Sequence, residues 1–324
     1  MRYALMTTLI AFLFSATSRA AELRVEEWTV PWPETRPREP EVAPDGTVWF
    51  AGQKGGYVGR LQPETGAFEK VDLGPGTGPH NVIVDDAGKV WIAGNRSAWI
   101  GRYDPSTGSL EKFPTPEPGA RDPHTLVFAP DGALWFTSQM GNNVGRLRPA
   151  TGDIDLVAVP TPAARPYGIK VSREGRPWVA LLGTNKLASV DPESLSLSEV
   201  ALPRADARPR RLVLSSDGDV WYVDYLEARL GRYRPRDGTF REWRTPGGDG
   251  AGPYGMAIDA KDRVFYVETG VTPNRMVVFD TREKQVLASA RIDSGAIRHM
   301  YYHPPSDAVW FGTDANTVGR ARLE

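Results

Sequence analysis

The sequence has no cysteine, only four histidines and a formal net charge of −1 at pH 7. The absence of cysteine excludes disulfides, thiol nucleophiles and cysteine-ligated zinc. A net charge so close to zero provides no general attraction to nucleic acid or to an anionic membrane, so neither is an expected partner. The function classes that depend on these features are therefore set aside.

Long apolar runs are also missing after residue 20, so we expect no membrane insertion. Within residues 1–20, Arg2 precedes a mostly apolar stretch, and Ser18-Arg19-Ala20 offers the small residues of a cleavage site. This pattern is typical of a secretory signal peptide. We therefore expect an exported protein, periplasmic or secreted, in which residues 21–324 form a single domain that acts as a monomer.

What the sequence does contain is a repeat. Seven strand-like segments with an aromatic anchor recur at intervals of 42 to 45 residues, and the anchors are Trp49, Trp91, Trp135, Trp178, Trp221, Phe265 and Trp310. Asp-Gly pairs such as Asp45-Gly46 and Asp217-Gly218 precede several anchors, as tight hairpins require. Several short strands per period of roughly 40–45 residues are typical of a β-propeller. The sequence therefore predicts an all-β, seven-bladed β-propeller with four antiparallel strands per blade.

Two further features of the repeat concern closure and packing. The seventh repeat ends after its third strand, near Leu323, whereas Arg24–Val30 resembles the fourth strands of other repeats. We therefore expect the N-terminal strand to join the C-terminal blade, which closes the ring and hides two sheet edges. A Val-Gly-Arg block, as at Val58–Arg60, marks most third strands. Its glycine is expected to let the next blade approach closely, and its arginine to cover the blade edge or pair with a carboxylate.

The repeat also predicts which residues surround one end of the central channel. The residues eleven positions before the anchors, where the innermost strands begin, are Arg38, His80, His124, Tyr167, Arg210, Tyr254 and His299. The residues three positions after the anchors are Gly52, Gly94, Ser138, Leu181, Asp224, Glu268 and Thr313. Antiparallel pairing places the two sets opposite each other at the open end of each hairpin. Both sets are therefore expected at the channel mouth, and three of the four histidines belong to the first.

These residue types support several kinds of chemistry. Guanidinium groups bind anions, and an imidazole serves as a base near neutral pH. Asp224 and Glu268 can hold a hard divalent cation, and Asp122, two residues before His124, adds a third acid. The expected partner is a small molecule that is anionic or rich in oxygen. Alternatively, the same side chains only bind water in a wet channel.

The segments Gly78-Pro79-His80 and Asp122-Pro123-His124, together with the turn-and-strand segments Asp86–Trp91 and Pro130–Thr137 that follow them, carry a family resemblance. They are similar to the virginiamycin B lyases, or streptogramin lyases, which are seven-bladed propellers. The resemblance covers essentially all of residues 21–324. It implies a carbon–oxygen lyase that opens a lactone or ester: a histidine removes a proton next to a carbonyl, Mg²⁺ polarises the carbonyl, and the ester carboxylate leaves.

By this resemblance, His124 is the base, Asp122 assists it, and His80 contacts the substrate. Ser138 stands where the family has a glutamate. In the sixth repeat Glu268 is present, but Gly252-Pro253-Tyr254 lacks the acid and the histidine. The parts of the family motif are thus divided between blades.

Three functions remain open on the sequence alone. The first is an exported lyase with His124 and Asp122 as catalytic residues. The second is a non-catalytic periplasmic binding or scaffold propeller that recognises an anionic ligand through residues such as Arg38, Arg210 and His299. The third, ranked below the others, is a lactone hydrolase of the gluconolactonase type, whose calcium site needs more carboxylates than this mouth offers.

Overall fold

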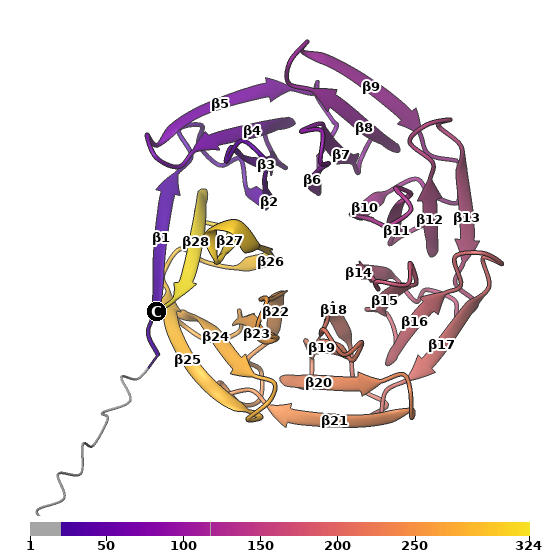
Figure 1. The fold of residues 1–324 in the computed structure, drawn as a ribbon, viewed down its shortest axis with the longest axis vertical. Coiled ribbons are helices and arrows are strands. Elements are labelled where there is room, and N and C mark those ends of the chain that lie inside the picture. Colours follow the sequence, from indigo (N-terminus) through magenta and orange to yellow (C-terminus); the bar gives the residue numbers. More distant parts are fainter. Residues whose placement is uncertain (1–20, 117) are drawn as a thin grey trace, which may run out of the picture.

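The structure is a computed structural model that describes residues 21–116 and 118–324, so the expected signal peptide, residues 1–20, lies outside the described residues. Seven four-stranded antiparallel sheets are arranged as blades around a common axis (Figure 1). The prediction of a seven-bladed propeller with four strands per blade is confirmed. Within the described ranges, no helix is long and apolar enough to cross a membrane.

Each blade runs from the axis outward in sequence order. The first three blades comprise β2 (Pro37–Val42), β3 (Val48–Gly52), β4 (Tyr57–Gln62) and β5 (Ala67–Asp72); β6 (Val82–Val84), β7 (Val90–Gly94), β8 (Trp99–Asp104) and β9 (Ser109–Pro114); and β10 (Pro123–Phe128), β11 (Leu134–Ser138), β12 (Asn143–Leu147) and β13 (Ile154–Ala158).

The next three blades comprise β14 (Pro166–Val171), β15 (Pro177–Leu181), β16 (Lys186–Val190) and β17 (Leu197–Ala201); β18 (Pro209–Leu214), β19 (Val220–Asp224), β20 (Arg229–Arg234) and β21 (Thr239–Arg244); and β22 (Pro253–Ile258), β23 (Arg263–Glu268), β24 (Asn274–Asp280) and β25 (Gln285–Ile292). The seventh comprises β26 (Ile297–His303), the short 3₁₀ helix η1 (Pro304–Ser306), β27 (Ala308–Thr313) and β28 (Thr317–Leu323).

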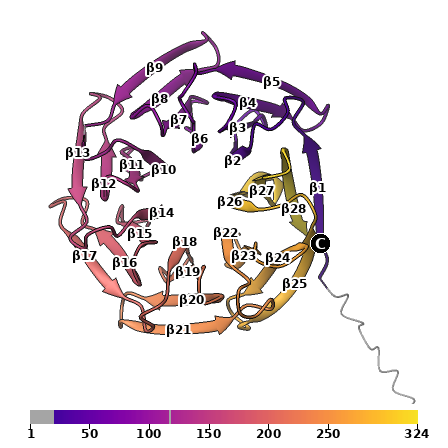
Figure 2. The same cartoon turned by 180° about the vertical axis from the view of Figure 1, so that it is seen from behind.

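The N-terminal strand closes the ring. Strand β1 (Leu23–Thr29) pairs antiparallel with β28, from Leu23 opposite Leu323 to Thr29 opposite Thr317. Figures 1 and 2 both show β1 on the outer edge of the seventh blade, beside the C-terminus. The fourth strand of that blade therefore comes from the other end of the chain, as expected, and it pairs the edge of β28 that would otherwise be open.

The core lies between neighbouring blades. The anchor Trp49 packs with Val82 and Val90 of the following blade, and the other aromatic anchors repeat this position. Trp91 and Trp135 are each only 1% exposed. Full burial of an aromatic side chain contributes roughly 3 kcal/mol relative to exposure, so the anchors stabilise the contacts that hold the ring together.

The third-strand block has a different role from the one predicted for its glycine. Gly59 lies directly opposite Phe50 of the same blade, and a Cβ at this position would overlap the Phe50 ring. Gly145 accommodates Phe136 in the same way. The glycine therefore accommodates an aromatic ring within its own sheet, and the prediction that it serves the approach of the next blade is wrong.

Candidate functional site

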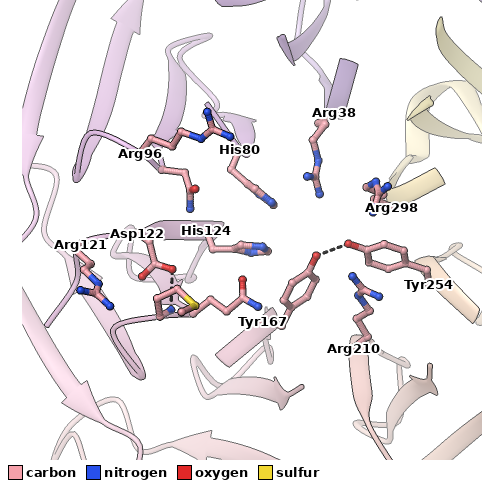
Figure 3. A pocket seen from close by; sticks show the side chains of 13 residues that line it. Arg38, His80, Arg96, Arg121, Asp122, His124, Tyr167, Arg210, Tyr254 and Arg298 are labelled. Carbon is pink, nitrogen blue, oxygen red and sulfur yellow. Dashed lines mark hydrogen bonds between the residues drawn. The ribbon is translucent and has the colours of Figure 1, made fainter. Parts of the chain in front are cut away.

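A pocket of about 550 Å³ opens at the end of the axis where the innermost strands begin (Figure 3). Six of the seven residues predicted eleven positions before the anchors line it: Arg38, His80, His124, Tyr167, Arg210 and Tyr254. None of the seven residues predicted three positions after the anchors, from Gly52 to Thr313, is among the lining residues, so that part of the prediction is wrong. These side chains come from six different blades and converge on one opening. Ring closure therefore brings together residues that are up to 216 positions apart in the sequence.

The seventh predicted residue, His299, does not line this pocket; Arg298 takes its place. In the sixth blade Ala257 pairs with Phe265, eight residues later, whereas in the seventh Tyr301 pairs with Trp310, nine residues later. The hairpin that contains η1 is one residue longer than the others. The residue equivalent to the other six therefore lies twelve positions before Trp310, at Arg298, and counting back eleven positions gives His299 instead. We call the residues at the mouth the outer tier: Arg38, His80, His124, Tyr167, Arg210, Tyr254 and Arg298.

The residue that follows each outer-tier position forms a second set, which we call the inner tier: Glu39, Asn81, Thr125, Gly168, Arg211, Gly255 and His299. Bulges in most of the first strands fall at these positions. Glu39 and Arg211 are 1% and 2% exposed, and they meet across the ring in a hydrogen bond of 2.5 Å. His299 Nδ1 lies 4.0 Å from Glu39 Oε2. The inner tier therefore places a buried ion pair directly beneath the outer tier.

Guanidinium groups dominate the wall of the pocket. Five arginines line it, Arg38, Arg96, Arg121, Arg210 and Arg298, against one carboxylate, Asp122. Arg298 is paired with Asp314 at 2.6 Å. Arg38 donates to Gln53 at 3.0 Å and has a terminal nitrogen 3.7 Å from Glu39 Oε1. Among the described residues, however, this nitrogen and the Nε atoms of Arg38 and Arg210 are buried without a hydrogen-bond partner. Unpaired buried donors of this kind are uncommon in proteins and favour an anion as their missing partner.

The aromatic side chains hold Arg210 in place. Its guanidinium carbon lies 3.7 Å from the ring centroid of Tyr254 and 4.3 Å from that of Tyr225. The hydroxyls of Tyr167 and Tyr254 are hydrogen-bonded to each other, as Figure 3 shows. Burial alone would raise the pKa of Tyr254, but Arg38, Arg210 and Arg211 outweigh it and lower this pKa to about 8, whereas burial raises the pKa of Tyr167. The pair therefore supplies a phenol that can exchange a proton just above neutral pH.

The two histidines of the mouth are in close contact, with their ring planes tilted by 36°. The rings of His80 and His124 lie 3.7 Å apart between centroids. Burial lowers the pKa of both imidazoles well below the usual value, and the positive charge of the neighbouring arginines lowers it further. Both rings are therefore neutral at neutral pH, and a neutral imidazole can act as a base or as a hydrogen-bond donor.

Asp122 does not contact His124. Its Oδ1 accepts hydrogen bonds from Ser138 Oγ at 2.5 Å and from the Gly141 amide at 3.1 Å, and its Oδ2 accepts one from the Met140 amide at 2.7 Å. The carboxylate thus holds the loop between β11 and β12, which carries Gln139 and Met140 to the pocket. His124 is not among the hydrogen-bond partners of Asp122, so no contact supports the prediction that Asp122 assists a catalytic base.

The two carboxylates predicted to bind a metal are similarly engaged. Oδ1 of Asp224 accepts backbone hydrogen bonds from Arg208, Leu226 and Glu227. Its Oδ2 accepts one from Arg204 at 2.8 Å. Glu268 accepts a hydrogen bond from the Gly247 amide at 2.6 Å, and its Oε2 lies 3.3 Å from Arg275.

In residues 21–116 and 118–324, no group of three or more His, Asp or Glu side chains is arranged to hold a metal ion. Mg²⁺ prefers several oxygen ligands that carry uncompensated charge. Arg204 and Arg275 already offset the charge of these two carboxylates, although Oε2 of Glu268 accepts no hydrogen bond from the described residues. They do not fit the Mg²⁺ that the resemblance implies.

Sequence reasoning missed Arg96, Arg121, Arg298, Tyr225 and the inner-tier pair of Glu39 and Arg211. Arg96 and Arg121 lie in the loops that flank the counted positions, so extending the repeat by a few residues on either side would have found them. The inner-tier pair lies one position after the counted residues. Its significance depends on a contact across the closed ring, which no spacing along the chain reveals.

Fold and site together define the class: a seven-bladed propeller with a polar ligand pocket at one end of its axis. The sequence matches the virginiamycin B lyase family over residues 23–164 and 152–324, and the chain therefore belongs to that family. A search of curated protein sequences gives no significant match.

Solved structures agree on the fold. The chain is similar to a streptogramin B lyase, with 21% identity, a TM-score of 0.83, and coverage of 93% of this chain and 98% of the other. It is also similar to the virginiamycin B lyase of Staphylococcus aureus, with 20% identity, a TM-score of 0.84, and coverage of 93% and 100%. A catalytically inactive variant of that enzyme has been crystallised with quinupristin. The extracellular domain of a putative hybrid two-component system from B. thetaiotaomicron is also similar, with 15% identity, a TM-score of 0.73, and coverage of 93% and 43%.

Proposed function

We propose that this protein is an exported carbon–oxygen lyase that binds a small lactone or ester at the channel mouth and opens it by elimination. The observation that carries the proposal is that one pocket holds two neutral imidazoles in contact and guanidinium donors of Arg38 and Arg210 that make no hydrogen bond to the described residues. Elimination from an ester needs a base for a carbon-bound proton and a positive site for the carboxylate that leaves. The outer tier offers both.

In the proposed reaction, one imidazole of the His80–His124 pair takes a proton from the carbon next to a carbonyl. The electron pair of that C–H bond forms a carbon–carbon double bond, and the C–O bond to the neighbouring carbon breaks. The ester oxygen departs with that bonding pair as part of a carboxylate. Arg38 and Arg210 stabilise the negative charge that develops, and they are held in place before the reaction begins.

Export is part of the proposal. It is supported by the signal-like composition of residues 1–20 and by the similarity to an extracellular domain. No step is assigned to a metal, because Asp224 and Glu268 are engaged with arginines and backbone amides.

The direct test is incubation of the purified protein with quinupristin, the ligand crystallised with the S. aureus relative. Elimination opens the lactone without changing its mass, whereas hydrolysis adds the mass of one water, so mass spectrometry separates the two reactions. We expect the ring-opened isomer from the wild type and none from the double variant His80→Gln/His124→Gln. His303→Gln, which lies off the mouth, is the matched control and should keep activity. A hydrolysed product would contradict the proposal, as would no product with this or other lactones.

A second candidate, a non-catalytic receptor for an anion, is favoured by one observation: the two carboxylates predicted to bind a metal, Asp224 and Glu268, serve loop structure and ion pairs. It predicts that small carboxylates or phosphate raise the melting temperature while quinupristin stays intact. Stabilisation without turnover would favour the receptor, and turnover that survives a chelator would favour the lyase.

A further inference from the structure

The inner tier contains a chain of contacts that the proposed reaction does not yet use. Glu39, in the first blade, holds Arg211 of the fifth blade, and both are almost completely buried. Glu39 has a φ of 47°, in the left-handed region that a residue with a side chain rarely adopts. A strained backbone at a buried charge persists only where the surrounding structure requires it, and such positions concentrate at functional sites.

Arg211 uses its remaining donors to connect two more blades. Its Nε donates to the carbonyl oxygen of Arg298 at 3.2 Å, and a terminal nitrogen donates to Thr125 Oγ1 at 3.1 Å. An arginine side chain has no acceptor and stays protonated. Thr125 Oγ1 must therefore accept this hydrogen bond, which leaves the hydroxyl proton of Thr125 to be donated elsewhere.

The hydroxyl of Thr125 lies 2.8 Å from His124 Nδ1. Within the described residues, this nitrogen is the only acceptor in contact with the hydroxyl proton. A buried hydroxyl proton without an acceptor is costly, so His124 Nδ1 accepts it. The proton of the neutral imidazole then resides on Nε2, and His124 carries an N–H donor there.

His80 has the opposite surroundings. Its Nδ1 lies 3.6 Å from Glu39 Oε1, the same oxygen that accepts from Arg211, and has no hydrogen-bond partner among the described residues. A lone pair on Nδ1 would face the negative carboxylate, whereas an N–H would be attracted to it. The carboxylate therefore favours the proton on Nδ1, which leaves the lone pair of His80 on Nε2.

We propose that the inner tier fixes these two neighbouring histidines in opposite tautomers, so that His124 acts as a hydrogen-bond donor to the ligand and His80 as the base. Glu39, Arg211 and Thr125 are positioning residues that act through these rings. The catalytic meaning rests on the proposed function: His80 takes the carbon-bound proton, and the N–H of His124 stabilises the carbonyl oxygen as it gains charge. This exchanges the roles that the sequence predicts for the two histidines.

The tautomers can be measured without any substrate. Long-range ¹H–¹⁵N NMR spectra of protein labelled with ¹⁵N-histidine distinguish a protonated ring nitrogen from an unprotonated one, and the variants His80→Gln and His124→Gln assign the signals. At pH 7.5 we expect Nδ1 of His124 and Nε2 of His80 to be unprotonated. Thr125→Val removes the donated proton with little change of shape, so His124 should lose its preference while His80 keeps its own. Thr115→Val, which removes a buried hydroxyl bonded to the Ala120 carbonyl away from the channel, is the control.

Two results would overturn the proposal: a proton on Nδ1 of His124 in the wild type, or unchanged tautomers of both rings in Thr125→Val. Glu39→Gln should weaken the tautomer preference of His80, but this variant leaves Arg211 without its ion-pair partner. If Glu39→Gln fails to fold, the spectra of Thr125→Val decide the question. A failure of the proposed lyase activity would leave the NMR result untouched. The two ideas therefore fail separately.

Discussion

The outer and inner parts of the blades differ in how faithfully they repeat. On the third strands, the same arrangement recurs in five blades: an arginine lies over the anchor tryptophan and beside a carboxylate, as Arg102 lies 5.4 Å from the Trp91 ring and pairs with Glu111. At the axis, by contrast, the inner tier holds Glu39, Arg211 and His299 once each. Positions that repeat serve packing that every blade needs. Positions that differ from blade to blade serve contacts made once, across the ring.

The largest expected effect comes from breaking the contact across the ring. Glu39→Gln or Arg211→Met alone leaves one buried charge without its partner, which should lower the free energy of unfolding by about 3–5 kcal/mol. Denaturant unfolding measures this effect. The double variant should recover a substantial part of the loss, because it removes both charges. Additive losses would show that the two residues do not act as a pair.

The next largest effect is expected in the way the free energy of unfolding changes at acidic pH. The pKa values of His80, His124 and His299 are all lowered from 6.5, first by burial and then by nearby arginines, so as the pH falls below 6.5 these rings bind protons in the unfolded chain before they do in the folded chain. The stability from these rings is complete above pH 6.5 and is lost as the pH falls. Burial raises the pKa of Glu41 from 4.5 to about 7, so its contribution has the opposite sign and is lost as the pH rises through 7.

Between pH 4.5 and 6.5 the three imidazoles therefore make the free energy of unfolding fall as the pH falls, and Glu41 opposes them; each proton of difference contributes up to about 1.4 kcal/mol per pH unit. Urea unfolding at several pH values measures this slope. His80→Gln should make the slope shallower, and Glu41→Gln should make it steeper. Slopes that shift in the same direction in both variants would contradict the assignment.

The smallest effect is expected at the periphery. Arg102→Met keeps most of the packing on Trp91 but removes an ion pair whose side chains are 35% and 52% exposed. Exposed pairs contribute about 0–1 kcal/mol, so unfolding should change by less than about 1 kcal/mol, and ligand binding should not change. If denaturant titration shows a larger loss in the free energy of unfolding, the arginine–carboxylate pairs of the third strands contribute more to stability than their exposure indicates.

The contrast between repeating and single positions also explains what the sequence could predict. The spacing of the anchors predicted the blades. The position of β1 could be predicted because the seventh repeat lacks a fourth strand, and both predictions follow from a constant period. Counting from the anchors placed six residues at the mouth but reached His299 instead of Arg298, since one extra residue in the η1 hairpin cannot be seen from the anchor alone. The pairing of Glu39 with Arg211 could not be predicted, because it joins blades that are 172 residues apart.

The glycine of the third strand is a local example of a contact whose partner the sequence could not predict. Its recurrence indicated a close approach, but the sequence does not say which neighbour approaches. The strand register provides the answer, because Gly59 stands opposite Phe50. Patterns along the chain thus identify constrained positions, and the partner is known only once strands are paired.

The central claim is that the mouth binds an anion through Arg38 and Arg210, and calorimetric titration with a panel of mono-, di- and tricarboxylates tests it most directly. A charge-assisted hydrogen bond contributes about 1.5–3 kcal/mol, so Arg210→Met should weaken binding of the best carboxylate by roughly 10- to 100-fold, while Arg102→Met binds as the wild type does. Equal binding by the wild type and Arg210→Met, or no binding of any carboxylate by the wild type, would contradict the claim.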